Sequence, residues 1–293
     1  MREELITAGE VAGLLGKRKK DTDKRDYGSV VLFAGKEGMA GAAILASKAA
    51  LRTGAGLVHI ATPKENFPIL QVAVPEAICI ERGDALERLN SFDAVGFGPG
   101  VGKSDEMKEL MAEVLKTSSK PLIIDADGLN LLAENKDLVE SLWFRDGGSA
   151  VLTPHAREAM RLEMAMSGVM DYLEIDRPTM VKKLAWKYEA VVALKGSGTL
   201  ITEAGLETIF RNPTGNPGMA TAGAGDVLTG IILALLGQGI DSINSAKAGA
   251  YIHGMAGDLA EEKYGERSLM AGDIIESLPE AFKILSKSEK VFV

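Results

Sequence analysis

The sequence predicts an α/β protein in which a mainly parallel β-sheet is covered by helices on both faces. Short, nearly continuous apolar segments of strand length alternate with helix-like segments over most of the 293 residues, as in sheets whose two faces are both buried. Unusual loops rich in Gly, Asp or His follow the expected strands, and such sheets bind ligands beyond the carboxyl ends of their strands. These loops are 35–41, 98–102, 125–130, 153–158, 195–199 and 216–226.

The expected strands are short apolar runs closed by Gly, Pro or a polar residue. In chain order they are Ser29–Ala34, Leu57–Ala61, Ala77–Ile80, Ala94–Phe97, Pro121–Ile124, Ala150–Leu152 and Ala190–Leu194. Two further segments, Thr199–Ile201 and Leu206–Phe210, are typical of a hairpin, with Glu203-Ala204-Gly205 near its turn.

Residues with helical spacing, or with small side chains, predict helices between these strands. In chain order the helices are Ala42–Thr53, Asp105–Lys116, Arg177–Tyr188, one that begins at Asp226, Ile243–Lys263 and Ala271–Leu285. The signals for residues 164–174 conflict. Because the sequence contains no internal repeat, low-complexity tract or clear linker, we expect one domain over residues 1–293, with residues 1–26 as an N-terminal arm.

The charge balance excludes several classes of partner. A net charge of −8 argues against nucleic acid and anionic membranes. Basic residues cluster at Lys17–Lys20 and Lys24–Arg25, but Asp21, Asp23 and Asp26 interrupt them. A solvated arm is therefore expected at this end of the chain, rather than a site for a polyanion.

Other features concern burial and location. The single Cys79 excludes an intrachain disulfide and lies in an apolar run, so a buried thiol is expected. His59 and His253 also lie on apolar runs and are expected to be satisfied core or boundary residues. The N-terminal residues show no signal or transit peptide, and the longest apolar stretch, Ile231–Leu236, is too short to span a bilayer. The cytoplasm is the expected location.

The segment NPGMATAGAGD, residues 216–226, is the strongest candidate for a functional site. Its small residues Gly223, Ala224 and Gly225 would let a phosphate approach the backbone N–H groups at the positive end of the next helix. The negative charge of Asp226 would repel that phosphate. An acid at this position therefore indicates a site that needs a base beside a phosphoryl group. For GAGD alone, an N-cap Asp that ends a Gly-rich turn is the alternative.

Three other loops carry candidate residues, and each has a purely structural alternative. Asp125 and Asp127 would hold Mg²⁺ directly or through water, unless Asp127 caps the next helix. His155 would hydrogen-bond a ligand and Glu158 would orient a metal-bound water, unless the two form a capping box. The KGSGT loop, residues 195–199, would grip nucleotide phosphates through its N–H groups and its lysine, unless it is a plain hairpin turn.

Two familiar nucleotide-binding motifs are absent. The sequence contains no G-x-x-x-x-G-K-[ST] and no G-x-G-x-x-G after the first strand. The GPGVG loop, residues 98–102, permits close backbone approach to a ligand, but a bend between strand and helix explains it equally well.

Taken together, these segments resemble the ADP/ATP-dependent NAD(P)H-hydrate dehydratase family, the carbohydrate-kinase-related domain of the ribokinase-like superfamily. The resemblance runs from about Tyr27 to about Ser277. It rests on YGSVVLFAG with GMAGAAILA, LVHIATP, GFGPGVG, PLIIDADGLNLL, LTPHARE, VALKGSGTLI and NPGMATAGAGDVLTGIILALLGQG. The set is highly specific, although no single segment is. It implies a ribokinase-like three-layer α/β/α sandwich with a mainly parallel central sheet.

The resemblance also implies an activity. The enzyme would be a hydro-lyase that converts the S form of hydrated NADH and NADPH back to NAD(P)H. A phosphoryl group passes from a nucleotide to the ring hydroxyl, and phosphate then leaves. Mg²⁺ bridges the donor phosphates. The family is often fused to an epimerase domain, for which this length has no room, so the stand-alone form is expected, with ADP favoured over ATP.

The resemblance assigns the residues to roles. Asp226 takes the proton from the substrate hydroxyl, the N–H groups of the small residues before it form an anion hole, and Glu158 contacts the metal through water. The anion-hole residues are Gly223, Ala224 and Gly225. The substrate-binding residues are Ala42, Gly100, Gly102, His155 and Asp226. The nucleotide-binding residues are Lys195, Gly196, Ser197, Gly198, Thr199 and Gly225.

Two alternative functions are compatible with the sequence, and an oligomeric state is also expected. A ribokinase-like small-molecule kinase, acting on a vitamin precursor or a sugar, would use the same Asp and anion hole but leave a stable phosphorylated product. A non-catalytic adenylate or dinucleotide sensor would not need Asp226. A homotetramer is expected from the family and from apolar residues on the last two helices, Tyr251, Ile252, Met255, Ile274, Ile275, Leu278 and Phe282.

Overall fold

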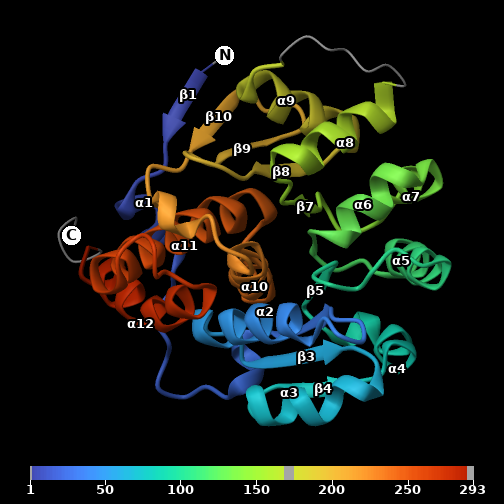
Figure 1. Cartoon of the computed structure of the whole chain (residues 1–293), viewed down its shortest axis with the longest axis horizontal. Helices are drawn as coiled ribbons and strands as arrows, with labels where there is room; N and C mark the ends of the chain where they lie inside the picture. Colours follow the sequence, from blue (N-terminus) through green and yellow to red (C-terminus); the bar gives the residue numbers. More distant parts are fainter. Residues whose placement is uncertain (1, 168–174, 289–293) are drawn as a thin grey trace.

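The computed structural model describes residues 2–167 and 175–288 and shows a central β-sheet between two layers of helices (Figure 1). The sheet has ten strands in the order β1-β10-β9-β8-β7-β6-β5-β2-β3-β4. Within the described residues, β9 alone runs against its neighbours, β8 and β10, and the other neighbours are parallel. The mainly parallel three-layer α/β/α architecture is therefore confirmed.

The strands follow the apolar runs of the sequence closely. They are β1 (Arg2–Leu5), β2 (Ser29–Phe33), β3 (Leu57–Ala61), β4 (Ile78–Ile80), β5 (Ala94–Phe97), β6 (Leu122–Ile124), β7 (Val151–Leu152), β8 (Val191–Leu194), β9 (Leu200–Glu203) and β10 (Thr208–Arg211). The predicted strands differ from these by at most one or two residues at an end. The antiparallel hairpin of β9 and β10 is also confirmed.

The inner strands supply alternate side chains to two separate cores. On β2, Val30 and Leu32 lie in one core and Val31 and Phe33 in the other, and all four are fully buried. The first core packs under α1 (Ala8–Leu14), α2 (Ala40–Thr53), α3 (Phe67–Ala73), α10 (Ala224–Gly237), α11 (Ser242–Tyr264) and α12 (Ala271–Ser288). The second packs under α4 (Arg82–Glu87), α5 (Asp105–Thr117), α6 (Asp127–Glu134), α7 (Lys136–Trp143), α8 (Ala156–Ser167) and α9 (Arg177–Tyr188). Burial on both faces explains why the strands read as continuous apolar runs.

Helices α2 and α10 lie against each other over most of their length. A Cβ atom added to Gly230 of α10 would lie 2.0 Å from the carbonyl oxygen of Ala46 on α2, so only glycine permits this approach. One added to Gly223, at the start of α10, would lie 2.4 Å from Leu45 Cδ1. The small residues of α2 thus allow both helices to begin at the same edge of the sheet.

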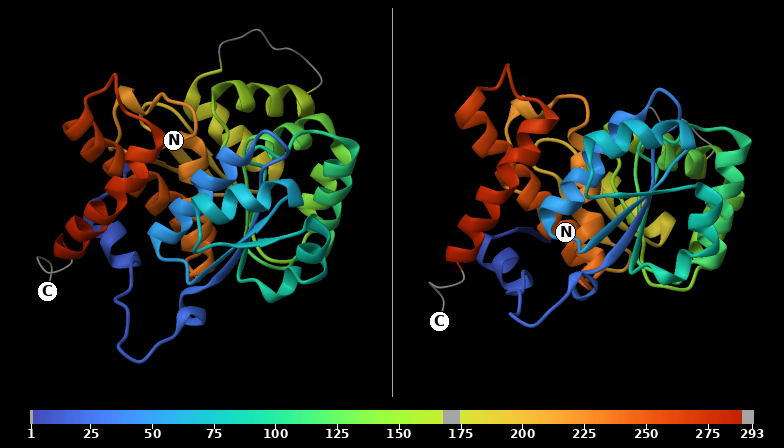
Figure 2. Two further views of the ribbon diagram at one scale, coloured as in Figure 1. Left: turned by 60° about the horizontal axis from the view of Figure 1, so that its bottom comes forward. Right: turned by 90° about the horizontal axis from the view of Figure 1, so that it is seen from below.

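The N-terminal arm is only partly a solvated segment. Strand β1 pairs in parallel with β10, and α1 packs onto the first core. The chain then forms a loop that leads back to β2 (Figure 2). In this loop Arg18 donates a hydrogen bond to the carbonyl oxygen of Gly54 at 2.6 Å and lies over the ring of Tyr27. Residues 2–14 thus complete the sheet edge and pack on the core, whereas the basic residues Lys17–Lys20 and Lys24–Arg25 are all exposed, as expected for a solvated segment.

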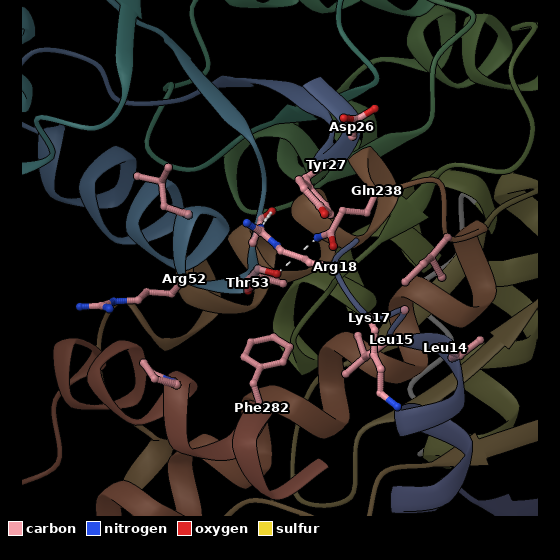
Figure 3. A pocket seen from close by; sticks show the side chains of 15 residues that line it. Leu14, Leu15, Lys17, Arg18, Asp26, Tyr27, Arg52, Thr53, Gln238 and Phe282 are labelled. Atoms are coloured by element: carbon pink, nitrogen blue, oxygen red, sulfur yellow. Dashed lines mark hydrogen bonds between the residues drawn. The ribbon is translucent and has the colours of Figure 1, made fainter. Parts of the chain in front are cut away.

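A cavity of about 610 Å³ lies under this loop, at the C-terminal ends of α2 and α10 (Figure 3). Its walls include Arg18, Tyr27, Thr53, Gln238 and Phe282. The candidate catalytic residues lie at the opposite, N-terminal ends of the same two helices. The cavity is therefore separate from the site described below.

Three further expectations concern burial, and two of them need correction. Cys79 is only partly buried, although partial burial still raises the pKa of its thiol. His59 is buried and its Nδ1 lies 3.3 Å from the carbonyl oxygen of Val30. His253 Nε2 is buried with no hydrogen-bond partner among the described residues, and burial lowers the pKa of the ring to about 4. Of the two histidines, only His59 is a satisfied core residue.

The sequence argument for a tetramer also fails. The apolar residues of α11 and α12 that were taken as excess surface pack onto the first core, with Ile252, Ile274, Ile275 and Leu278 buried and Tyr251, Met255 and Phe282 partly buried. The oligomeric state itself stays a prediction. In the described part of the chain, no helix is long and apolar enough to cross a membrane.

Candidate active site

The candidate residues gather where parallel strands end. Strands β8, β7, β6, β5 and β2 are neighbours that run in the same direction, so the loops that follow them share one edge of the sheet. Helix α10 begins at this edge too, beside α2. The topology thus brings together segments that are up to about 190 positions apart in the sequence, as expected for an α/β ligand site.

The start of α10 is an open anion-binding turn. Its N-cap is Gly223, which has a left-handed φ of 89° and makes no side-chain capping hydrogen bond. The first N–H groups of a helix have no acceptor within the helix, so those of Gly225 and Asp226 are free to face an anion, whereas the N–H of Ala224 donates to the carbonyl oxygen of Thr221 at 3.4 Å. Asp226 lies in the first turn of the helix rather than at its N-cap, so the capping alternative for this residue is wrong.

The carboxyl group of Asp226 has an unusual environment. Burial raises its pKa to about 6, with a further rise from the charge of Asp125 and an opposing effect from Lys195. A carboxylate with a pKa near neutrality is ionised above that pH and is a stronger base than an ordinary one. The position and pKa therefore suit proton removal beside a bound phosphoryl group.

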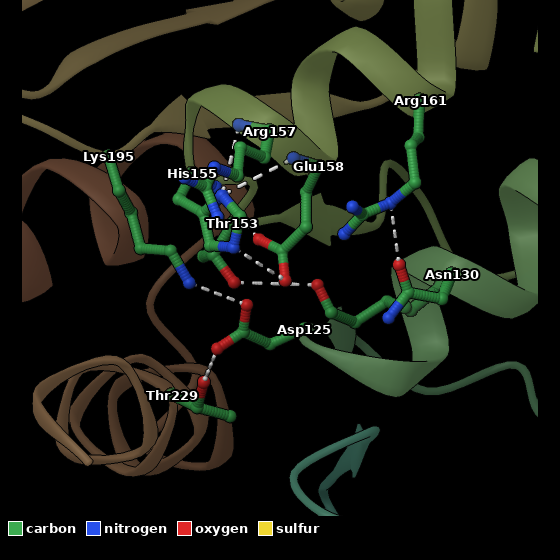
Figure 4. A network of polar contacts seen from close by, with 10 residues as sticks. Asp125, Asn130, Thr153, His155, Arg157, Glu158, Arg161, Lys195 and Thr229 are labelled. Atoms are coloured by element: carbon green, nitrogen blue, oxygen red, sulfur yellow. Dashed lines mark hydrogen bonds and ion pairs between the residues drawn. The ribbon is translucent and has the colours of Figure 1, made fainter. Parts of the chain in front are cut away.

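The charges that act on Asp226 belong to a network that the sequence did not predict, and Figure 4 shows its members Asp125, Lys195 and Thr229. Lys195 Nζ donates to Asp125 Oδ1 at 2.7 Å, and Thr229 Oγ1 donates to Asp125 Oδ2 at 2.7 Å. Burial opposes the charge of Lys195, but Asp125 and Glu158 outweigh it and raise the lysine pKa. The ammonium lies 3.3 Å from where a Cβ of Gly225 would be, so it adds positive charge directly under the anion-binding turn.

His155 and Glu158 form a capping box at the start of α8, which was the structural alternative for this pair. The backbone N–H of His155 donates to Glu158 Oε2 at 2.8 Å, and the N–H of Glu158 donates to His155 Nδ1 at 3.3 Å. Glu158 is buried, and burial raises its pKa. The imidazole of His155 is 48% exposed, and its Nε2 lies 3.5 Å from Glu158 Oε1.

Asp127 does not cap α6, contrary to one of the two readings of this residue. The N-cap position is Ala126, and Asp127 Oδ2 instead accepts the N–H of Gly102 at 2.8 Å. Asp125 is occupied by Lys195 and Thr229. Among the described residues, no group of three or more His, Cys, Asp and Glu side chains could hold a metal ion. The pair Asp125 and Asp127 therefore has structural contacts that the magnesium hypothesis did not anticipate.

The predicted substrate-binding residues of two loops lie side by side. Gly100 has a φ of 64°, and a Cβ on it would lie 3.2 Å from Ala42 Cβ. Gly102 has a φ of 84° and lies under the side chain of Lys36, whose backbone N–H donates to the carbonyl oxygen of Gly100 at 2.7 Å. The loops thus form a continuous backbone surface at the start of α2.

The KGSGT loop is a hairpin turn and is also placed at the candidate site. It joins the antiparallel strands β8 and β9, and Gly196 and Gly198 have φ values of 145° and 61°. Its first residue, Lys195, reaches Asp125 under the anion-binding turn. The structural and functional interpretations of the loop are therefore compatible.

Comparison with known proteins agrees with this arrangement. A family model described as NAD(P)H-hydrate dehydratase matches residues 30–280. The chain belongs to the NAD(P)H-hydrate dehydratase family. An ADP-dependent (S)-NAD(P)H-hydrate dehydratase of Neisseria meningitidis is 35% identical over 278 residues, which cover 93% of this chain and 91% of that protein. The predicted family is confirmed.

Other family members are longer. A bifunctional NAD(P)H-hydrate repair enzyme of Coxiella burnetii is 43% identical over 268 residues, 90% of this chain but 52% of that protein. The chain spans about half the length of such bifunctional relatives. The ADP/ATP-dependent NAD(P)H-hydrate dehydratase of Bacillus subtilis, co-crystallised with ATP and Mg²⁺, has a TM-score of 0.85 at 29% identity and covers 96% of this chain and 98% of its own. The fold is ribokinase-like, as the sequence predicted.

Proposed function

We propose that this chain is an ADP-dependent (S)-NAD(P)H-hydrate dehydratase, a nicotinamide-nucleotide repair enzyme. The observation that carries the proposal is Asp226, a carboxylate of raised pKa in the first turn of an uncapped helix, close enough to the partly buried Lys195 to feel its charge. That combination suits a base beside a phosphoryl group. The names of the relatives supply the substrate and the donor.

The reaction follows from the chemistry of the hydrate. Hydroxide is a poor leaving group, so the ring hydroxyl is first phosphorylated. Asp226 removes the hydroxyl proton as the oxygen attacks the terminal phosphorus of ADP, and the bond to AMP breaks. The ring nitrogen then expels phosphate, and a proton leaves the neighbouring ring carbon to restore the double bond. The N–H groups of Gly223, Ala224 and Gly225, with Lys195 below them, stabilise the charge on the phosphoryl oxygens.

The two substrates would occupy opposite sides of Asp226. The dinucleotide would lie on the surface of Ala42, Gly100 and Gly102 and reach His155. The donor would lie along residues 195–199 and Gly225. Mg²⁺ would accompany the donor phosphates, and Glu158 would contact it through water. When bound, the ion neutralises phosphate charge.

The decisive experiment supplies the purified chain with the S form of hydrated NADH, with and without ADP or ATP and Mg²⁺, and follows the reduced-nicotinamide absorbance. We expect recovery only with nucleotide, and one phosphate released for each dinucleotide restored. A stable phosphorylated product would indicate the small-molecule kinase, and nucleotide binding without turnover would indicate the sensor. Recovery without nucleotide would contradict the proposal.

We expect the rate to depend on the ionisation of Asp226. Because the base must be ionised, kcat should rise with pH through about 6. Asp125→Asn removes a neighbouring negative charge that raises the Asp226 pKa, so the midpoint should move to lower pH. Asp137→Asn, at an exposed residue of α7, is the control and should leave the midpoint unchanged. A midpoint that stays in place in Asp125→Asn would contradict this electrostatic coupling.

The division into two half-sites predicts opposite kinetic effects. His155→Ala removes a ligand contact and should raise KM for the hydrate by about 2- to 10-fold, the range for one neutral hydrogen bond. Gly198→Val forces a side chain into a φ of 61° and against Arg211, so it should raise KM for ADP instead. Steady-state kinetics with each substrate varied would test both. Equal effects on the two substrates would show that the half-sites are wrongly divided.

Assembly and location belong to the same proposal. We expect a homotetramer in the cytoplasm, and light scattering at micromolar concentration measures the mass of the particle. If the particle has the mass of one chain and full activity, the tetramer prediction is contradicted and the proposed reaction is unaffected.

A further inference from the structure

The KGSGT loop is held by Arg177, the first residue of α9. The guanidinium donates to the carbonyl oxygens of Leu194 at 3.2 Å, Gly198 at 3.1 Å and Ser197. It also covers Gly196, where an added Cβ would lie 3.2 Å from Arg177 Nη2. One guanidinium thus bonds the residue before the loop and two residues within it, and the loop contains two glycines.

A second guanidinium covers the other glycine. A Cβ added to Gly198 would lie 3.1 Å from Arg211 Nη1, so Arg211 supports the loop where its φ is 61°. Arg211 is held in turn by Glu3 of β1, which accepts from its Nε at 3.0 Å and its Nη2 at 2.8 Å. The N-terminal strand therefore reaches the loop through one ion pair.

These contacts matter for a loop of this composition. Glycine is the residue with the largest conformational freedom, so a loop with two of them in five residues loses much entropy when it orders around a ligand. A loop that is already held in shape avoids that loss on binding. Burial, and the positive charge of Arg211, lower the pKa of Arg177, so the two cations sit close enough to repel. An anion bound at the loop would relieve that repulsion.

We propose that Arg177 and Arg211 are positioning residues that hold loop 195–199 in its nucleotide-binding shape, and that Glu3 makes the N-terminal strand part of this support. The inference rests on the proposed function in that it takes ADP as the ligand of the loop. Neither arginine touches the reacting atoms. Their removal should weaken nucleotide binding and leave the dinucleotide half-site intact.

The test compares Arg177→Met, Arg177→Lys, Arg211→Met and Glu3→Gln with the control Lys182→Met. Lys182 lies on the same helix as Arg177 and also donates to a backbone carbonyl, that of Leu206 in the β9–β10 turn, away from the loop. The affinity for ADP with Mg²⁺ is measured by calorimetry, which does not require turnover. Hydrogen exchange of residues 195–199 reports the order of the loop, and thermal melting reports the fold.

We expect Arg177→Met to weaken ADP binding at least about tenfold, equivalent to about 1.4 kcal/mol of loop ordering. Exchange in residues 195–199 should become faster, whereas KM for the hydrate should stay within about twofold. Arg177→Lys should recover part of the affinity, because a lysine reaches one carbonyl but cannot span three. Arg211→Met and Glu3→Gln should have smaller effects in the same direction, and Lys182→Met none.

Several results would overturn the proposal. Unchanged ADP affinity in Arg177→Met would show that the loop keeps its shape without the arginine. Equal weakening in Lys182→Met would show a general effect on α9. No ADP binding by the unmodified chain would show that the loop is not a nucleotide site. If ADP binds and the variants behave as expected but no hydrate is restored, the result supports Arg177 and Arg211 as positioning residues and contradicts the proposed reaction.

Discussion

Asp226→Asn is expected to abolish most of the turnover while the protein stays folded and still binds ADP. A positioned general base contributes about 10²- to 10⁴-fold, so kcat should fall by that factor. Asparagine keeps the shape of the side chain but cannot accept the proton of the ring hydroxyl. The substitution also removes negative charge next to the donor phosphates, so ADP should bind as tightly as before or more tightly.

The structure separates this outcome from loss of the helix. Asp226 is in the first turn of α10, whereas the N-cap is Gly223, so no side-chain cap is lost. Circular dichroism should therefore match the unmodified chain, urea unfolding should show no loss of stability, and calorimetry should report ADP binding. Above about pH 6 the stability should even rise slightly, because burial disfavours the ionised form of Asp226. Asp241→Asn, at the N-cap of α11, is a control whose amide retains a capping oxygen, and its kcat should not change. Unchanged turnover in Asp226→Asn would remove this residue as the base.

Much of the fold was predictable because the sheet is buried on both faces. Strands such as Ser29–Phe33 are runs of apolar residues that no amphipathic helix would show. Strand β1 was missed because it is a polar edge strand, Arg-Glu-Glu-Leu, and its only pairing is with β10, about 200 residues later. The short helices α3, α4 and α7 were missed as well, because six to eight residues give too little periodicity.

The loops of the candidate site could be predicted from the sequence, but the contacts between their side chains could not. Glycines such as Gly100 and Gly198 marked these loops in the sequence, because a position with a positive φ usually needs a glycine. The pair of Asp125 and Lys195 joins strand ends 70 positions apart, and only the strand order determines that they meet. The only signal in the sequence was an acid at the end of one buried strand and a lysine at the end of another.

The ion pair of Asp125 and Lys195 leads to the second prediction with a large expected effect. Lys195→Met is expected to destabilise the fold by about 3–5 kcal/mol, because it leaves Asp125 buried with an uncompensated charge. Lys195 also lowers the pKa values of Glu158 and Asp226, so these carboxyl groups become harder to ionise as well. Urea unfolding measures the loss, and Lys103→Met, at an exposed pair with Glu134, is the control with an expected cost of at most about 1 kcal/mol.

If the loss of stability in Lys195→Met comes from uncompensated charge, urea unfolding should show two further results. Carboxyl groups whose folded-state pKa is raised contribute stability at low pH and lose it as the pH rises through that pKa. The cost of Lys195→Met should therefore be larger at pH 8 than at pH 5. The double variant Lys195→Met/Asp125→Asn should recover most of the stability, because removing both charges of a buried pair is often close to neutral. A cost that is independent of pH and persists in the double variant would assign the effect to packing of the lysine chain and not to its charge.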